Sequence, residues 1–229
     1  MSSRIFHLSS KQPEIVCKIF PPIQLNSEAA VIGLTHFQVY NSIPNVDSNN
    51  NVFTYQDNVN KPFYDIVIPE GTYELADIES FLKLQLGEEN VYIKPNINTL
   101  KCDFFCKYNV DFTKKNSIGQ LFGISYKKYL ANSVETSSIP IQISRINTIQ
   151  IELNIVSGSY VNGLPTNCLY KCFISTPPGY RIVESPNNPI YLPVNTTEID
   201  ILHLKLTDER GNLINLRNEE FTIELHLKL

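Results

Sequence analysis

Hydrophobic and polar residues alternate over most of the chain, as expected for β-strands that bury one face. The clearest case is the final segment, Glu220 to Leu229, where an apolar residue stands at every second position. The segment before it, Glu198 to Thr207, changes its apolar phase near Leu202, which predicts a bulge or twist there. We expect these two segments to pair as a hairpin around Asp208 to Asn215 and to complete a β-sandwich.

Other segments share this period of two. Strands are predicted in Pro13 to Leu25, Ala29 to Tyr40 with a bulge at Thr35 and His36, Val52 to Gln56, Phe63 to Pro69, Asn90 to Lys94, Leu100 to Tyr108, Ile139 to Ile143, Asn147 to Val156, Cys168 to Ile174, Tyr180 to Val183 and Ile190 to Pro193. The segment 168–174 is apolar on both faces, which favours a central position in its sheet.

A different period marks residues 75–86. Leu75, Ile78, Phe81, Leu82 and Leu86 form one apolar stripe at helical spacing, and Gly87 is a natural stop. This segment is predicted to be the one substantial helix, packed across the end or flank of the sandwich. A single helical turn is also predicted over Ser117 to Leu121, with Asn116 as its cap.

About ten strands with one helix and no strand–helix alternation exclude a doubly wound α/β fold. The fold class predicted is all-β, a single jelly-roll β-sandwich of two opposed antiparallel sheets. A jelly roll is favoured over an immunoglobulin fold because the strands are too many and the chain has no Trp. The domain is predicted to cover residues 12–229, and the polar residues 1–11 are predicted to be a flexible N-terminal arm.

Composition narrows the possible functions. Charged residues make up only 18% of the 229 residues, the net charge is -4, and no basic tract is longer than a pair of lysines. We therefore expect no direct nucleic-acid binding. No apolar run approaches the length that spans a membrane, and residues 1–10 lack the apolar core of a signal peptide.

The five cysteines suggest core packing. Without a signal peptide we expect reduced thiols in a protein made in the cytosol or nucleus. Cys102 and Cys106, like Cys168 and Cys172, stand four apart in strand patterns. Residues at that spacing on a strand are about 13 Å apart, so one pair cannot grip one ion. The even spacing instead places each pair on one face as small buried residues.

A search for catalytic patterns finds none. The four histidines, His7, His36, His203 and His226, include no His-x-His pair of the kind that holds metal in cupins. His203 and His226 lie on the outward faces of the last two strands, where they could meet across a hairpin, with a surface or contact role favoured over catalysis. We predict no catalytic, cofactor-binding or metal-binding residue, no cofactor, and no enzymatic activity.

A series of blocks along the chain resembles a known protein family. The blocks are VIGLTHFQVYNSIPNV (31–46), IPEGTYELADIESFL (68–82), INTLKCDF (97–104), SIGQLFGIS (117–125), INTIQIELNIVSGSYVNG (146–163), PPGYRIVESPNNPIYLPVN (177–195) and LTDERGNLINLRNEEFTIELHLKL (206–229). In order and spacing they resemble the minor capsid, or penton, proteins of Polinton/Maverick elements and of the related adintoviruses and virophages. No block is a catalytic signature.

The resemblance implies a structural protein. It implies a single jelly roll that assembles into homopentamers at the fivefold vertices of an icosahedral virion, among major capsid proteins with a double jelly roll. It also implies synthesis in the host-cell cytoplasm, and assembly could take place in the nucleus. We also expect no added tower or receptor-binding insertion, because no stretch of the chain is long enough for one. Two alternatives stay open: a soluble lectin-like module for carbohydrate or peptide, and a host-domesticated capsid-derived protein.

Overall fold

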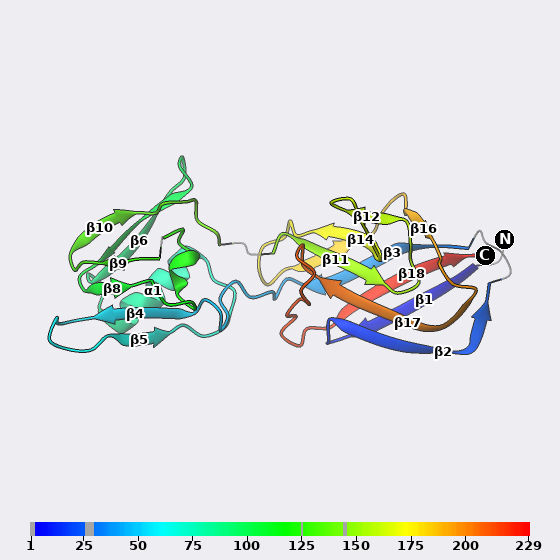
Figure 1. The fold of residues 1–229 in the computed structure, drawn as a ribbon, viewed down its shortest axis with the longest axis horizontal. Helices are drawn as coiled ribbons and strands as arrows, with labels where there is room; N and C mark the ends of the chain where they lie inside the picture. Colours follow the sequence, from blue (N-terminus) through cyan, green and yellow to red (C-terminus); the bar gives the residue numbers. More distant parts are fainter. Residues whose placement is uncertain (1–2, 26–29, 125, 144–145) are drawn as a thin grey trace. The chain divides into compact units, whose positions relative to one another are not determined.

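The computed structural model describes residues 3–25, 30–124, 126–143 and 146–229. They divide into two compact units (Figure 1). Unit 1 combines the two ends of the chain, residues 1–43 and 146–229, and unit 2 is the intervening segment 44–145. This division differs from the single domain predicted over residues 12–229. The expectation that the chain carries no insertion was wrong, because unit 2 is inserted between two strands of unit 1.

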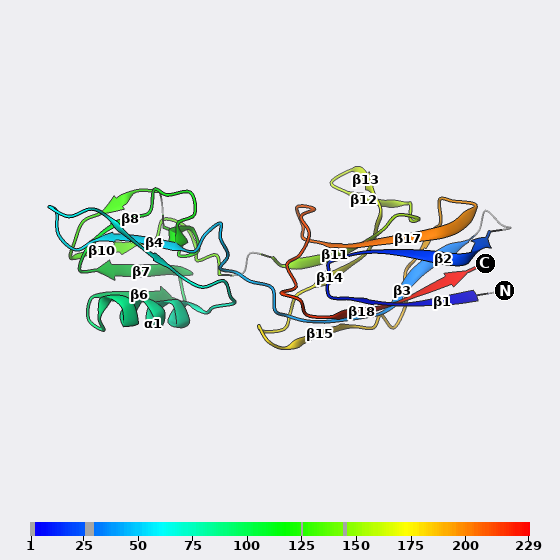
Figure 2. The same ribbon diagram turned by 90° about the horizontal axis from the view of Figure 1, so that it is seen from below.

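Unit 1 is a sandwich of two antiparallel sheets (Figure 2). Sheet one has the order β1 (Ser3–Ser10), β18 (Phe221–Lys228), β3 (Val31–Tyr40), β15 (Arg181–Glu184), with β16 (Tyr191–Pro193) also paired to β3. Sheet two has the order β14 (Cys168–Phe173), β11 (Thr148–Leu153), β17 (Glu198–Thr207), β2 (Glu14–Gln24). A short hairpin of β12 (Ser159–Val161) and β13 (Leu164–Thr166) stands apart from both sheets.

The strand order confirms the jelly-roll prediction. If the eight long strands of unit 1 are numbered along the chain, sheet one reads 1-8-3-6 and sheet two reads 5-4-7-2. Consecutive strands thus alternate between the two sheets for most of the chain, as in the double Greek key of a jelly roll. Alternating side chains from both sheets fill one core, which includes Phe37, Ile151, Leu204, Phe221 and Leu225.

Strand order also corrects three predictions. Residues 3–10 are not an arm: they form β1, which pairs with β18 along eight residues. The last two strands do not form a hairpin, because β17 pairs with β2 and β11 while β18 pairs with β1 and β3. Strand β14 pairs only with β11 and so lies at an edge, not at the centre.

Both predicted strand irregularities are confirmed. The β18–β3 ladder shifts register between Glu224 and Leu225, opposite His36 and Leu34. The β17–β2 ladder shifts between Ile199 and Ile201. Each shift lets apolar side chains on both sides of the bulge face the core.

Unit 2 has a core of its own between two antiparallel sheets. One sheet has the order β5 (Tyr64–Val67), β4 (Val52–Gln56), β8 (Asn109–Asp111), β9 (Lys128–Tyr129), and the other has the order β10 (Ser133–Thr136), β7 (Lys101–Cys106), β6 (Val91–Asn96). A single 3-10 turn, η1 (Ile118–Gln120), is capped by the Ser117 hydroxyl, one residue later than predicted. The predicted strand 139–143 has no strand conformation.

The predicted helix is confirmed as α1 (Leu75–Leu86). Its first turn is closed by a reciprocal capping box between Glu74 and Asp77, and Gly87 ends it with a positive φ of 102°. Ile78, Leu82 and Leu86 are buried in the core of unit 2. Glu79 accepts a hydrogen bond from the backbone amide of Ile93, which ties the helix to β6. No described helix is long and apolar enough to cross a membrane.

Candidate functional site

The described residues contain no group of three or more His, Cys, Asp or Glu side chains placed to hold a metal ion. His203 and His226 do not meet, because β17 and β18 belong to different sheets. His203 pairs with Glu14 at 2.6 Å on sheet two, and His226 lies 2.8 Å from the Tyr191 hydroxyl on sheet one. Four free cysteines are buried, which confirms the core role predicted for them: Cys102, Cys106, Cys168 and Cys172.

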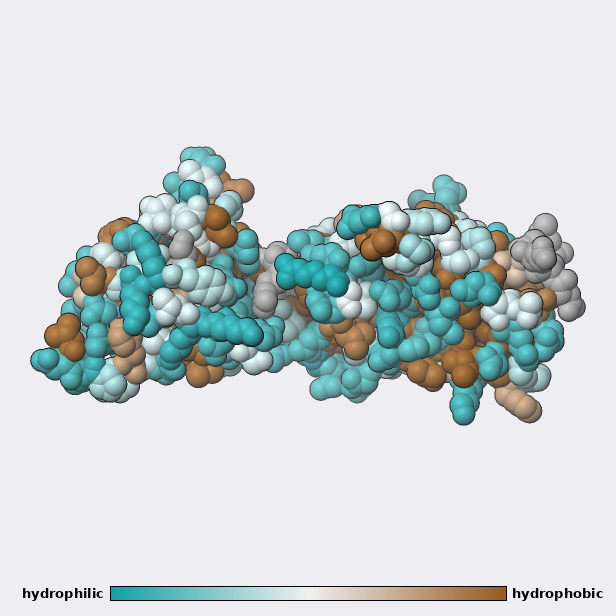
Figure 3. Space-filling view, viewed as in Figure 1, coloured by the Kyte–Doolittle hydropathy of each residue, from teal (hydrophilic) through white to brown (hydrophobic). Residues whose placement is uncertain are grey.

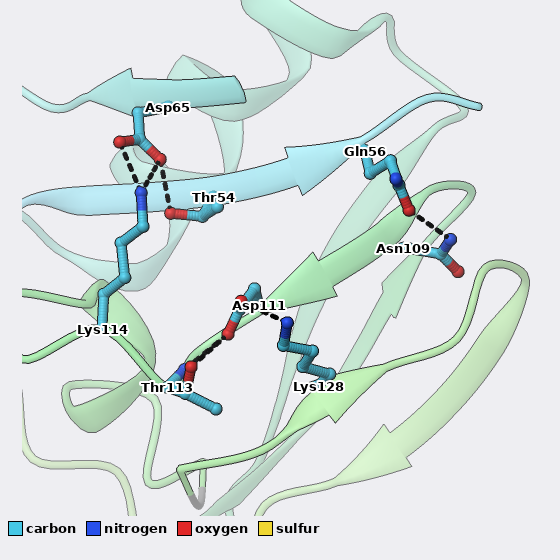
Figure 4. Close-up of polar contacts among 8 residues, drawn as sticks. All are labelled: Thr54, Gln56, Asp65, Asn109, Asp111, Thr113, Lys114 and Lys128. Carbon is cyan, nitrogen blue, oxygen red and sulfur yellow. Dashed lines mark hydrogen bonds and ion pairs between the residues drawn. The ribbon is translucent and has the colours of Figure 1, made fainter. Parts of the chain in front are cut away.

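Three sets of polar contacts in unit 2 are drawn in Figure 4. The Asp65 carboxylate accepts hydrogen bonds at 2.6 Å from the Lys114 ammonium and the Thr54 hydroxyl. Burial raises the pKa of Asp65, but these donors outweigh burial and leave it below its usual value. Asp111 has the same arrangement, with the Thr113 hydroxyl at 2.6 Å and Lys128 at 3.1 Å.

These contacts connect the strands of unit 2, and neither Asp65 nor Asp111 is placed to act as a catalytic acid or base. In Asp111, too, burial raises the pKa and the donors from Thr113 and Lys128 more than offset it. Each carboxylate is therefore ionised near neutral pH and already matched to one lysine. A catalytic acid would need the opposite shift, and a catalytic base would need a free lone pair facing a substrate. The contacts of Asp65 and Asp111 join strands β5, β4, β8 and β9 to the loop after β8 (Figure 4).

The edge of unit 1 formed by β1 and β2 leaves apolar side chains partly exposed. Three residues separate these strands, and each is the last strand of its sheet. The inward-facing side chains of this edge pack against the core yet stay partly exposed: Phe6 and Leu8 from β1, and Ile15, Cys17 and Ile19 from β2. On the neighbouring strands β18 and β17 the inward-facing residues are fully buried.

Further apolar side chains extend this open edge onto the outer faces of both sheets. Ile5 is 56% exposed, Val16 60% and Phe20 94%. Figure 3 shows a broad hydrophobic area over the part of unit 1 where Figure 1 draws β1 and β2. Single exposed apolar residues are ordinary, but a contiguous patch that continues the core is typical of a protein interface.

The opposite edge, formed by β14 and β15, is closed by polar contacts. The Glu184 carboxylate accepts hydrogen bonds from the Tyr170 hydroxyl at 3.2 Å and from the Cys172 thiol at 3.7 Å. Burial, together with the Glu184 charge, raises the pKa of the Cys172 thiol to about 12. Exposed apolar residues are still present outside this closure, namely Phe173, Tyr180 and Val183.

The sequence pattern did not reveal the open edge. Its residues are ordinary alternating strand residues, and the segment 3–10 has only two large inward-facing apolar side chains. A patch of this kind depends on which strand ends each sheet, and local alternation contains no such information.

Comparison with known proteins identifies the fold. No family model and no curated protein matches the chain. Among solved structures, the chain is similar to the mavirus penton protein in its selenomethionine-labelled crystal form. The TM-score is 0.53 at 12% sequence identity, and the match covers 99% of both chains. The chain therefore shares the fold of a virophage penton protein across both units.

Proposed function

We propose that this protein is a structural, non-enzymatic capsid subunit of the penton type. The observation that carries the proposal is the likeness to the mavirus penton protein over 99% of both chains, with an eight-stranded jelly roll as the main unit. The open apolar edge supports it independently, because a free subunit would leave that surface in water.

The finer statement concerns the assembly. We propose a homopentamer that occupies the fivefold vertices of an icosahedral virion and contacts a major capsid protein with a double jelly roll. The sequence blocks favour a Polinton/Maverick, adintovirus or virophage origin. A host-domesticated copy would keep the same fold and the same edge, so the assembly test applies to both.

Ring geometry explains why two different edges are useful. A closed ring with cyclic symmetry needs a heterologous contact, in which one patch of each subunit meets a different patch of the next. Unit 1 has apolar residues on two opposite edges: the open β1–β2 edge and the side chains Phe173, Tyr180 and Val183 near the closed edge. The first patch docking against the second would bury both around a ring.

The test is the oligomeric state of the purified full-length chain. We expect light scattering coupled to size-exclusion chromatography to give the mass of five subunits, and negative-stain electron microscopy to show fivefold rings. A strictly monomeric protein at high concentration, with no ring in the images, would contradict the proposal. A lectin-like module would instead stay monomeric and bind glycans.

A further inference from the structure

The end of the β6–β7 hairpin in unit 2 is an exposed surface that the proposed assembly does not use. The turn exposes Ile97 by 86% and Leu100 by 62% of their surface. The segment 137–143 lies beside it, because the Ile141 amide donates to the Leu100 carbonyl at 2.8 Å. That segment adds Ile139, which is 48% exposed.

This surface has no charge. Residues 95–100 read PNINTL and residues 137–143 read SSIPIQI, with no Asp, Glu, Lys or Arg in either segment. Figure 3 shows hydrophilic residues at the outermost end of the hairpin that Figure 1 draws projecting from unit 2, with hydrophobic residues beside them. Its large apolar side chains are aliphatic, whereas the central residues of protein–protein interfaces are enriched in Trp, Tyr and Arg.

Side chains of the turn bind three of its backbone amides. The Asn96 side-chain oxygen accepts hydrogen bonds from the amides of Asn98 at 3.1 Å and Thr99 at 3.2 Å. The Lys101 amide donates to the Thr99 hydroxyl. Unpaired amides would oppose entry into an apolar phase, so this arrangement lowers the cost of leaving water.

Leu100 is held in an uncommon conformation. Its φ of 56° lies in the left-handed region, which a residue with a branched side chain rarely adopts. Asn or Gly would fit this turn with less strain, yet the turn places a large aliphatic side chain in solvent. Strained residues of this kind cluster at functional surfaces.

Two lysines flank the turn. Lys94 is exposed on β6, three residues before Ile97, and Lys101 follows Leu100 on β7. At about 3.3 Å per residue, Lys94 is roughly 10 Å behind the tip. Asp103, which stands opposite Lys94 in the β6–β7 ladder, accepts a hydrogen bond from the Thr136 hydroxyl at 2.7 Å.

We propose that the uncharged end of the β6–β7 hairpin inserts Ile97 and Leu100 into the interfacial layer of an anionic lipid bilayer. Apolar groups enter this layer to a depth of about 5–10 Å, which places Lys94 at the level of anionic headgroups, while Lys101 lies at the margin of the inserted turn. The uncharged turn with its two aliphatic side chains, the amides bound by Asn96 and Thr99, and the lysines on either side fit a lipid surface better than a protein partner.

The test is vesicle flotation with the full-length protein. Vesicles contain phosphatidylcholine alone or with about three parts in ten of phosphatidylserine. We expect the protein to float with the phosphatidylserine vesicles, and Ile97→Asn with Leu100→Asn to lower the bound fraction about tenfold. Asn suits the left-handed position, so Leu100→Asn preserves the turn. Lys94→Gln with Lys101→Gln lowers binding to the anionic vesicles only.

Leu84→Asn is the matched control, because Leu84 is 79% exposed on α1 of the same unit. It leaves flotation unchanged. Absence of flotation by the unmodified protein, or equal flotation of the Ile97→Asn, Leu100→Asn variant, overturns the proposal. Sedimentation of the same variants reports ring assembly separately, so a failure of lipid binding is distinguishable from a failure of the proposed function.

Discussion

The two edges of the unit 1 sandwich close in different ways. At the β14–β15 edge, Glu184 binds Tyr170 and Cys172, so polar contacts seal the space between the sheets. At the β1–β2 edge no comparable bridge is present among the described residues, and apolar side chains such as Phe6 and Ile15 stay partly exposed. The same fold thus produces one finished edge and one that needs a further surface to cover it.

This difference separates the residues that specify the fold from those that leave apolar surface exposed. The central strands specify the fold, because their inward-facing residues are fully buried. The edge strands specify what the fold can join, because they alone decide how much apolar surface remains. The predictions below separate these two roles.

The largest effect is expected from removing β1. Deleting residues 1–10 removes Phe6 and Leu8 from the core margin and uncovers the backbone of β18. We expect a loss of about 3–5 kcal/mol in the free energy of unfolding, seen as a lower melting temperature by circular dichroism and a smaller soluble fraction. Deleting residues 1–2 is the control. A truncation at residue 10 that melts like the intact protein would restore the flexible-arm interpretation.

Cysteine reactivity compares the two edges directly. Cys17 is partly exposed at the open edge, whereas Cys172 is buried at the closed edge with its pKa raised from 9.0 to about 12. The thiolate is the reactive form, so this shift lowers its population at Cys172 about a thousandfold. We expect iodoacetamide at about pH 8 to modify Cys17 in the free subunit and to leave Cys172 untouched.

Assembly should change only one of these cysteines. Mass spectrometry of the assembled protein is expected to show Cys17 protected, since the open edge is then covered. Equal reactivity of Cys17 in free and assembled protein would place the contact elsewhere.

A smaller effect is expected from opening the closed edge. Glu184→Ala removes the acceptor of the Tyr170 and Cys172 hydrogen bonds and leaves two polar groups without it. The free energy of unfolding should fall by about 1–3 kcal/mol. The pKa of Tyr170, which burial and Glu184 both raise, should move back toward its ordinary value in a spectroscopic titration. Glu184→Gln retains an acceptor, so its stability should lie between those of the Ala variant and the original protein.

The smallest effect concerns Glu14 on β2. Hydrogen bonds from His203 and Lys205 lower its pKa despite some desolvation. A carboxyl with a lowered folded-state pKa stabilises the fold above its unfolded value of 4.5, and this contribution is lost as the pH falls through the folded pKa. Because Glu14 is exposed, Glu14→Gln should change the melting temperature only slightly at neutral pH and not at all in strong acid. A large change would mean that the pair is shielded from solvent.

The sequence predicted the positions of helices and strands better than it predicted which strands pair. Helical spacing located α1, and strict alternation located β18 and the β6–β7 hairpin, because these patterns are local. Alternation could not show that β17 and β18 join different sheets, since a strand looks the same whichever neighbour it pairs with. Unit 2 was missed for the same reason: its strands alternate like those of unit 1, and only long-range pairing separates them.

The sequence could not predict the candidate interface at the β1–β2 edge for a related reason. Phe20 and Val16 look like ordinary members of an alternating strand, and their exposure follows from the place of β2 at the end of its sheet.

The central claim is that the β1–β2 edge is a subunit contact, and sedimentation velocity on two matched variants tests it most directly. Val16→Ser with Phe20→Ser changes the open edge, while Tyr160→Ser with Leu164→Ser changes equally exposed apolar residues in the β12–β13 hairpin. All four side chains are exposed, so both variants should fold. We predict that the first variant sediments as a monomer and the second as the pentamer. Pentamers from both variants would contradict the account.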